Sequence, residues 1–429
     1  MSELQRSFAK AKLAGLPSEA LLPLDTFREE DECPEGQADE FCPWSQSAQD
    51  EDSSSASSTG TIKPNRKHLF AKPTGLSTGG TLLKPLAWTR YFAQEYYLEN
   101  VRPDGVVIHH VYLTPPANKG PLFVLHHGAG SSGLSFAVFA AELLEALPDA
   151  GVLSIEARGH GETVVKSNDG IIKGEPHDLS IGLLSSDLSK TVQLVQAKLG
   201  WPHLPDIVLI GHSLGGAIIT DVASRGTLGT AVLGYVVLDV VEGSAVDALQ
   251  QMNLYLAMRP KTFPSLASAI DWHVRSRTIR NNLSARVSVP PLLYQEAESS
   301  LCSDSRPWKW RTDLLMTEQY WASWFTGLSK KFLEAKGGKL LILAGTDRLD
   351  KELMIGQMQG KYQLQVFPEA GHFIHEDQPR KTTMLVLDFY RRNNRSALIL
   401  PPKVSQLVRE SATVNKTGIS PDRKEGHVA

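Results

Sequence analysis

The chain has 429 residues, of which 41% are hydrophobic, enough for one large domain with extensions or for two smaller domains. A formal net charge of -3 excludes a general nucleic-acid binder, because no strongly basic field is available to displace counterions. Only three cysteines are present, which indicates a reducing compartment and excludes a secreted disulfide scaffold. No run of eighteen apolar residues and no signal-peptide core occurs, so we expect a soluble protein of the cytoplasm and/or nucleus, without membrane contact.

Both ends of the chain are polar. Residues 1–67 form an acidic and then serine-rich extension with few large apolar side chains, and burial there cannot offset the entropy of ordering the chain. We expect this extension to be disordered, with a regulatory or partner-binding tail as the alternative. Residues 401–429 are aperiodic, and we expect a flexible tail. The folded domain is then expected over residues 68–400.

The middle of the chain alternates between short β-branched runs and helical patterns. Strands are expected at 106–112, 121–126, 152–157, 207–211, 235–239, 340–345 and 362–367, and helices at 136–147, 183–199 and 382–392. The later five strands are almost continuously apolar, as in strands covered on both faces. This order predicts an α/β fold with a mostly parallel sheet flanked by helices.

One interval breaks the alternation. Residues 242–336 show no clear strand and are rich in Trp, Arg and Ser, and they are too long for an ordinary connection. We expect a helical insertion above the carboxyl ends of the strands, where it acts as a lid. Trp308, Trp310, Trp321 and Trp324 in it are either core residues or a grip for a peptide, and Arg259 and Lys261 are either solvated charges or partner contacts.

The strongest motif is GHSLGG at residues 211–216, where an expected strand passes directly into a helical pattern. This strand–turn–helix context is the one in which G-x-S-x-G forms a nucleophile elbow. Glycine is needed at 211 and 215 because side chains there would collide across the turn. The motif predicts Ser213 as the nucleophile, with the backbone amide of Leu214 beside its hydroxyl.

A glycine-rich loop, HHGAG at 126–130, follows an earlier strand. Acyl transfer places negative charge on the carbonyl oxygen, and fixed N–H donors stabilise that charge. The loop is similar to the HGGG type of oxyanion loop. We predict Ala129 and Leu214 as the donor pair, the alternative being a plain turn that needs small residues.

The order of triad residues in such folds is serine, acid, histidine. His372 follows the last expected strand, with Gly371 before it, so we predict it as the base that activates Ser213. His375 is expected at the start of the next helix as a structural residue. Two aspartates, Asp239 and Asp347, follow strands, and the residues alone leave the choice of acid open. The triad chemistry needs no metal and no cofactor.

Beyond these motifs, the insertion and its flanks resemble the protein phosphatase methylesterase family of α/β hydrolases. The resemblance covers roughly residues 80 to 395 and includes GHSLGGAI, RPKTF, SARVS, IGQMQGK and GHFIHED. It implies that Asp239 is the acid and Asp347 a supporting residue. It also implies a partner and substrate, the catalytic subunit of protein phosphatase 2A, whose C-terminal leucine methyl ester would be hydrolysed to methanol and carboxylate.

Two other functions remain open from the sequence: a general small-ester hydrolase, and a phosphatase-binding protein that does not need its active site. A strand is followed by three polar residues, Glu156, Arg158 and His160. They either line the bottom of the active site or belong to a structural loop. We also hypothesise that docking of the partner reorganises the site, so that the triad is incompletely aligned without it.

Overall fold

A computed structural model describes residues 83–394, except for 104, 168–169, 172–177, 296–305 and 346–348. The expected extension at 1–67, the tail at 401–429 and Asp347 lie outside the described residues. The strands are β1 (Gln94–Arg102), β2 (Gly105–Thr114), β3 (Leu122–His126), β4 (Gly151–Ile155), β5 (Val164–Ser167), β6 (Gly170–Ile171), β7 (Ile207–His212), β8 (Val232–Leu238), β9 (Thr262–Phe263), β10 (Leu293–Tyr294), β11 (Trp308–Trp310), β12 (Gly338–Leu343) and β13 (Gln363–Val366).

The helices fall between these strands. They are α2 (Ala137–Ala146), α3 (Ile181–Leu199), α4 (Leu214–Arg225), α5 (Glu242–Met258), α6 (Leu266–Arg275), α7 (Asn282–Ser288), α8 (Glu318–Phe325), α9 (Leu328–Glu334), α10 (Lys351–Met358), α11 (Ile374–Asp377) and α12 (Pro379–Asn393), with 3-10 turns η1 (Trp88–Arg90), η2 (Gly133–Phe136), η3 (Gly229–Ala231), η4 (Pro290–Leu292) and η5 (Leu314–Thr317). Each expected strand and helix of the alternating region is present, with boundaries within a few residues.

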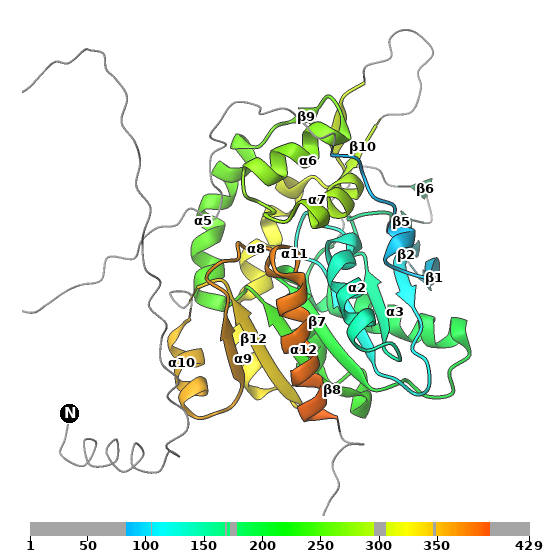
Figure 1. The fold of residues 1–429 in the computed structure, drawn as a ribbon, viewed down its shortest axis with the longest axis vertical. Helices are drawn as coiled ribbons and strands as arrows, with labels where there is room; N and C mark the ends of the chain where they lie inside the picture. The colour runs from blue at the N-terminus through cyan, green and yellow to red at the C-terminus, as the bar shows by residue number, and fades with distance from the viewer. Residues whose placement is uncertain are drawn as a thin grey trace, which may run out of the picture. The chain divides into compact units, whose positions relative to one another are not determined.

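The main sheet has ten strands in the order β13-β12-β8-β7-β3-β4-β2-β5-β6, and β1 also pairs with β2. The strands from β13 to β4 pair in parallel, whereas β1, β2, β5 and β6 add antiparallel pairs at the other side. Helices α2 and α12 cover one face and α3, α4 and α9 the other (Figure 1). Alternate residues of the central strands supply both layers; in β7, for example, Leu209 packs with α3 and α4 while Ile210 packs toward α2.

The strand order places the site. After β3 the chain forms α2 on one face, and after β7 it forms α4 on the opposite face, although β3 and β7 are hydrogen-bonded neighbours. The loops leaving two such strands diverge and open a crevice at their carboxyl ends, which is where parallel α/β sheets bind ligands. The expected oxyanion loop leaves β3 and the expected nucleophile leaves β7, so the topology brings both to one crevice.

The insertion after β8 differs from the expected all-helical lid. It contains a three-stranded sheet, β10-β11-β9, beside α5, α6, α7 and α8. These strands have only two or three residues each, too few to produce a recognisable alternation in the sequence. A small core of its own supports this region, formed by Phe263, Ala269, Ile270, Ile279, Ala285, Val289 and Leu293. Toward the end of the interval, α9 already packs on the main sheet, where the Tyr235 hydroxyl donates to the carbonyl of Phe332 at 2.6 Å.

The two pairs of lid tryptophans have different environments. Trp321 and Trp324 are about 95% buried and join the core beneath α4, so both are core residues. Trp308 and Trp310 are half-buried in the short lid sheet. The interpretation as core residues is therefore confirmed for Trp321 and Trp324, whereas Trp308 and Trp310 are only partly buried.

Candidate active site

Ser213 occupies the turn between β7 and α4. Its backbone has φ 52° and ψ -119°, a conformation that costs energy for a residue with a Cβ. The amide of Ser213 donates to the carbonyl of Leu238 on the neighbouring strand β8 at 3.0 Å, and its carbonyl accepts from Gly216 at 2.8 Å. These bonds hold the strained residue, and they place its side chain at the carboxyl edge of the sheet as the motif predicts.

The flanking glycines are required by backbone contacts. A Cβ on Gly211 would lie 2.2 Å from the carbonyl oxygen of Gly215, and one on Gly215 would lie 2.1 Å from the carbonyl oxygen of His126. Both neighbours are backbone atoms within the sheet and the elbow, so neither can move aside without disturbing β3 or β7. The expectation of a collision across the turn is confirmed, and the second glycine also permits close approach to β3.

We expect Gly215→Ala to lower the free energy of unfolding by about 3 kcal/mol or more, because the new methyl group overlaps the β3 backbone. Gly243→Ala is the matched control, since it lies in the first turn of α5, where the nearest atom to a new Cβ is Asp350 Cβ at 3.3 Å. We expect the control to stay within about 1 kcal/mol of the parent protein. Urea unfolding followed by circular dichroism measures both; equal stability of the two variants contradicts the steric argument.

His372 and Asp239 form a hydrogen-bonded pair. The Nδ1 atom of His372 lies 2.8 Å from Oδ2 of Asp239, and the aspartate side chain is fully buried. Oδ1 of Asp239 accepts the amide of Ala344 at 2.9 Å, so the carboxylate is oriented by β12 as well as by β8. With Nδ1 engaged, Nε2 is the ring nitrogen left to face a nucleophile.

Asp239 itself has a positive φ of 52°. Aspartate tolerates this region better than most residues. The turn lets the side chain leave the end of β8 toward the histidine, while its amide donates to the carbonyl of Ile342 at 2.8 Å. The structure therefore brings Asp239 to His372, in agreement with the assignment that the family resemblance implies.

The third contact of the expected triad is not made. Among the described residues, no hydrogen bond joins the hydroxyl of Ser213 to the ring of His372, whose side chain is 21% exposed. Hydrogen bonds of catalytic groups are often long before substrate binds. The described residues thus contain a hydrogen-bonded acid–base pair, His372 with Asp239, and a serine that is not hydrogen-bonded to it.

The expected oxyanion loop lies against the nucleophile. A Cβ on Gly128 would lie 3.0 Å from Cβ of Ser213. Within the described part of the chain, neither the amide of Ala129 nor that of Leu214 donates to another residue. Leu214 opens α4, whose first-turn amides have no intrahelical acceptor and whose dipole favours negative charge. Both donors that the sequence suggested are available beside Ser213.

Two neutral histidines fix this loop. The amide of Gly130 donates to Nε2 of His160 at 2.8 Å, and the amide of Ala157 donates to Nε2 of His127 at 3.0 Å. In each ring Nδ1 then donates to a carbonyl, that of Arg158 or that of Gly128. Burial lowers the pKa of both imidazoles, which keeps Nε2 free to accept. The sequence did not predict the role of His127. His160 supports the loop structurally, which is one of the two alternatives stated for it.

Glu156 and Arg158 complete the support. The carboxylate of Glu156 accepts the amides of Gly133 at 3.2 Å and Glu162 at 2.7 Å and lies 2.8 Å from His110 Nδ1. Arg158 forms a bidentate pair with Asp187 of α3, at 2.7 and 3.0 Å. Both residues are about 95% buried or more, so they hold the loop rather than meet substrate. The structural alternative is the one that the geometry supports.

The loop carrying His372 is held by its neighbours on two sides. Behind it, Nε2 of His212 donates to the carbonyl of His372 at 2.9 Å, and the two rings are 4.6 Å apart. From the lid, the amide of Arg280 donates to Oδ1 of Asp377 at 2.7 Å, while Oδ2 accepts the amide of Gly371 at 2.6 Å. No sequence pattern singled out Arg280 or Asp377 beyond their place in the family motifs. The position of the base is thus coupled to the position of the lid.

His375 lies in α11, as expected, and is fully buried with its ring stacked on Phe136 at 4.1 Å. Neither ring nitrogen bonds to another described residue, and burial lowers its pKa well below the usual value. Burial also lowers the pKa of five further histidines, to about 4 in three of them: His109, His126 and His273, besides His127 and His160.

These six imidazoles predict loss of stability in acid. The unfolded chain binds protons near pH 6.5 and the native chain does not, so stability present above pH 6.5 is lost as the pH falls toward 4, by up to about 1.4 kcal/mol per pH unit for each group. The raised pKa values of His110, Glu376 and Asp377 oppose this trend, but they are fewer. We expect the free energy of unfolding, measured in urea, to fall steeply between pH 7 and pH 5.

His375→Leu provides the control, since it removes a titrating ring without breaking a hydrogen bond to any described residue. We expect the free energy of unfolding of this variant to fall less steeply with decreasing pH than that of the parent chain. The difference in slope corresponds to the uptake of up to one proton fewer on unfolding. An identical slope for the two proteins would show that His375 is not kept neutral in the native state.

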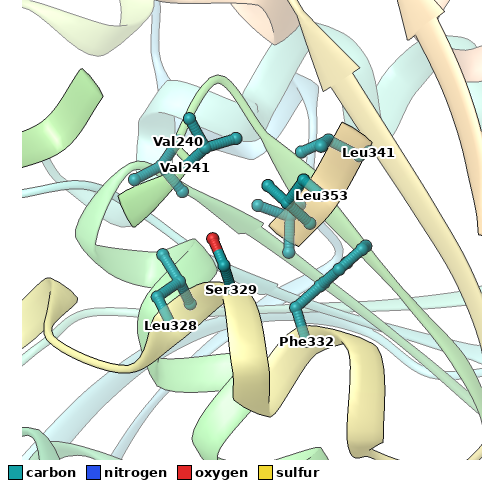
Figure 2. A pocket seen from close by; sticks show the side chains of 8 residues that line it. Val240, Val241, Leu328, Ser329, Phe332, Leu341 and Leu353 are labelled. Carbon is teal, nitrogen blue, oxygen red and sulfur yellow. The ribbon is translucent and has the colours of Figure 1, made fainter. Parts of the chain in front are cut away.

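One enclosed space lies near the acid but is not a substrate site. A cavity of about 10 Å³ is lined by Val240 and Val241, which follow Asp239, and by residues of α9 and α10. Figure 2 shows the side chains that line it. Its wall is apolar apart from Ser329, whose hydroxyl already donates to Asp350. The space is barely enough for one water molecule and has too few polar groups to hold it.

The described residues contain no group of three or more His, Cys, Asp or Glu side chains able to hold a metal ion. Within the same residues, no helix is both long enough and apolar enough to cross a lipid bilayer.

Comparison with known proteins places the chain in two steps. A family model described as alpha/beta hydrolase family matches residues 123–383, and the fold expected from the sequence is confirmed. Among solved structures, E-2-(acetamidomethylene)succinate hydrolase aligns with a TM-score of 0.51 at 17% identity, over 69% of this chain and 100% of that one. A peroxisomal alpha-beta-hydrolase from Saccharomyces cerevisiae aligns with a TM-score of 0.50 at 13% identity, over 76% and 98%.

Sequence relatives narrow the assignment. Protein phosphatase methylesterase 1 of Aspergillus oryzae is 58% identical over 96% of this chain and 95% of its own length. The proteins of that name from Neurospora crassa and Schizosaccharomyces pombe are 50% and 45% identical, over 96% and 74% of this chain and 100% and 87% of their own lengths. The chain belongs to the protein phosphatase methylesterase 1 family, as the motifs of the insertion indicated.

Proposed function

We propose that this chain is a serine esterase that removes the methyl ester from the C-terminal leucine of the protein phosphatase 2A catalytic subunit. The observation that carries the proposal is the buried Asp239–His372 hydrogen bond beside the strained Ser213 elbow, in a chain whose relatives are named as protein phosphatase methylesterases. Support for the particular phosphatase comes from the motifs of the insertion. The sparse cysteines support a cytoplasmic or nuclear location.

The proposed reaction uses the roles that the geometry allows. The Ser213 oxygen forms a bond to the ester carbonyl carbon while His372 Nε2 takes the hydroxyl proton, and Asp239 stabilises the resulting imidazolium. The negative charge on the carbonyl oxygen is stabilised by the amides of Leu214 and Ala129. The bond to the methoxy group then breaks, and His372 returns the proton so that methanol leaves.

Water completes the cycle. His372 takes a proton from water as the water oxygen attacks the acyl-enzyme carbonyl, and the bond to Ser213 breaks as its oxygen regains the proton. The products are a free carboxylate on the protein tail and the original enzyme. We propose that the lid region within residues 242–336 shapes the entrance to this site. We also propose that residues 1–67 and 401–429 are extensions of the hydrolase domain.

The test is mass spectrometry of the esterified phosphatase C-terminus after incubation with this protein and with Ser213→Ala. Loss of one methylene's mass with the parent protein alone supports the proposal. Hydrolysis of simple esters with no change in the phosphatase would instead indicate a general esterase. Binding of the phosphatase without demethylation by either protein would indicate a binding protein with a dispensable site.

A further inference from the structure

Arg259 of the lid presents a guanidinium that no other part of the described chain neutralises. It follows α5, and its Cζ lies 4.5 Å from the centre of the Trp310 ring. Among the described residues, none accepts a hydrogen bond from its side chain or forms an ion pair with it. Other arginines near the crevice are paired, Arg158 with Asp187 and Arg311 with Glu162 at 3.0 Å. Arg259 thus has hydrogen-bond donors to offer.

The surroundings of Arg259 make the lack of a partner costly. Burial lowers its pKa, and the nearby Tyr255 and Asp313 only partly oppose this. Asp313 is exposed, its Oδ1 accepts the amide of Leu315, and among the described residues it forms no ion pair with the guanidinium. A half-buried cation without an ion-pair partner has lost part of its hydration, and a bound anion offsets that loss.

Trp310 forms a fixed platform under this cation. Its Nε1 donates to the carbonyl of Pro260 at 2.7 Å, and its ring contacts Phe263, Trp272 and His273 edge-on. Burial lowers the pKa of His273 to about 4, so at neutral pH this ring adds no charge beside the platform. Stacking on a rigid aromatic face orients a guanidinium and leaves its edge free for bidentate binding.

The platform is linked to the oxyanion loop. Beyond Trp310, the hydroxyl of Thr312 donates to the carbonyl of Gly159 at 3.1 Å, and the Leu314 side chain covers Gly130, with Cδ1 only 2.7 Å from where a Cβ would lie. The four residue-to-residue steps from Trp310 to Leu314 span at most about 14 Å when extended. An extended peptide covers a similar length in about four residues, so one end can lie at Ser213 while another side chain reaches Arg259.

We propose that Arg259 and Trp310 form a lid subsite that binds a carboxylate side chain of the substrate polypeptide, a few residues before its esterified end. A carboxylate fits the planar donor edge of arginine in a bidentate manner. The inference rests on the proposed function for the esterified polypeptide, and it adds a specificity element outside the triad. The subsite selects acidic tails over neutral ones of the same length.

The test uses short peptides ending in leucine methyl ester, each with a single aspartate or asparagine at the second to fifth position from the end. Binding is measured by calorimetry in the Ser213→Ala background, so that hydrolysis does not interfere. We expect the aspartate peptide to bind about tenfold more tightly than its asparagine partner at one of these positions, and Arg259→Gln to reduce that ratio to about one. Arg259→Lys restores part of the ratio, since it keeps the charge and loses the fork.

Lys261→Gln is the matched control, because it removes the same charge from an exposed residue two positions along the chain. It should keep the aspartate preference. The proposal is overturned if the aspartate peptide is not preferred at any position. It is also overturned if the preference persists in Arg259→Gln, or if Lys261→Gln loses the preference to the same extent. Preference for phosphoserine with none for aspartate overturns the assignment to a carboxylate. If the parent protein binds the aspartate peptide but leaves its methyl ester intact, the subsite stands and the esterase function fails.

Discussion

Ser213→Ala is expected to lower kcat for ester hydrolysis by about 10⁴- to 10⁶-fold, because the remaining histidine and amide donors act as a unit with the nucleophile. The alanine variant keeps the Asp239–His372 pair and the amides of Leu214 and Ala129, so residual hydrolysis reports what these groups achieve alone. Steady-state kinetics on a methyl-esterified peptide measures the loss. A residual rate within tenfold of the parent rate would remove Ser213 from the mechanism.

A second variant at the same position separates chemistry from strain. Ser213→Gly also lacks a nucleophile, but glycine adopts φ 52° without the penalty that serine and alanine share. We therefore expect the glycine variant to be more stable than the alanine variant by about 1 kcal/mol while both are inactive. Equal stability of the two variants would mean that the elbow stores no strain.

The features that the sequence predicted best are those imposed by local sterics. The elbow at 211–215 could be recognised because backbone atoms of β3 and α4 approach the two glycines so closely that no side chain fits. His372 could be chosen among thirteen histidines by its place after the last strand. In both cases a short stretch of chain contains all the information that the prediction needs.

The choice of acid could not be made that way. Asp239 and Asp347 both follow parallel strands, and parallel strands end at one edge of the sheet, so both positions satisfy the same pattern. What distinguishes Asp239 is a hydrogen bond to a residue 133 positions along the chain and a backbone turn with positive φ. Family resemblance supplied the answer that residue patterns left open.

The lid was harder to predict for a different reason. Its strands of two or three residues contribute few positions to any periodic pattern, and its core includes aromatic residues that also suit a binding surface. The contact that links the lid to the loop of the base, from Arg280 to Asp377, joins residues 97 positions apart in sequence. Such pairings depend on how the two regions dock, which local propensity does not determine.

Those contacts suggest why the nucleophile and base are not yet coupled in the free chain. His372 is held by Asp239, by His212 and, through Gly371, by a lid residue. A small movement of the lid would therefore be transmitted to the ring, whereas Ser213 is fixed by the sheet.

The acid assignment makes the second large prediction, that Asp239→Asn lowers kcat by about 10⁴-fold with little change in fold. The asparagine oxygen can still accept the amide of Ala344, as Oδ1 of Asp239 does at 2.9 Å. Its NH₂ group then faces Nδ1 of His372 and requires that nitrogen to accept. The proton of the neutral ring moves to Nε2, the atom that must take the proton of Ser213, and the imidazolium loses its counter-charge.

Asp347→Asn is the control that decides between the two aspartates. If Asp239 is the acid, the control keeps kcat within about tenfold of the parent value, because a supporting residue acts only through others. The pH–rate profile is an independent test. The altered tautomer of Asp239→Asn persists at every pH at which the ring is neutral, so raising the pH should not restore the rate. A large loss in Asp347→Asn together with an active Asp239→Asn would transfer the role to the later strand, and the buried pair with His372 would then be structural.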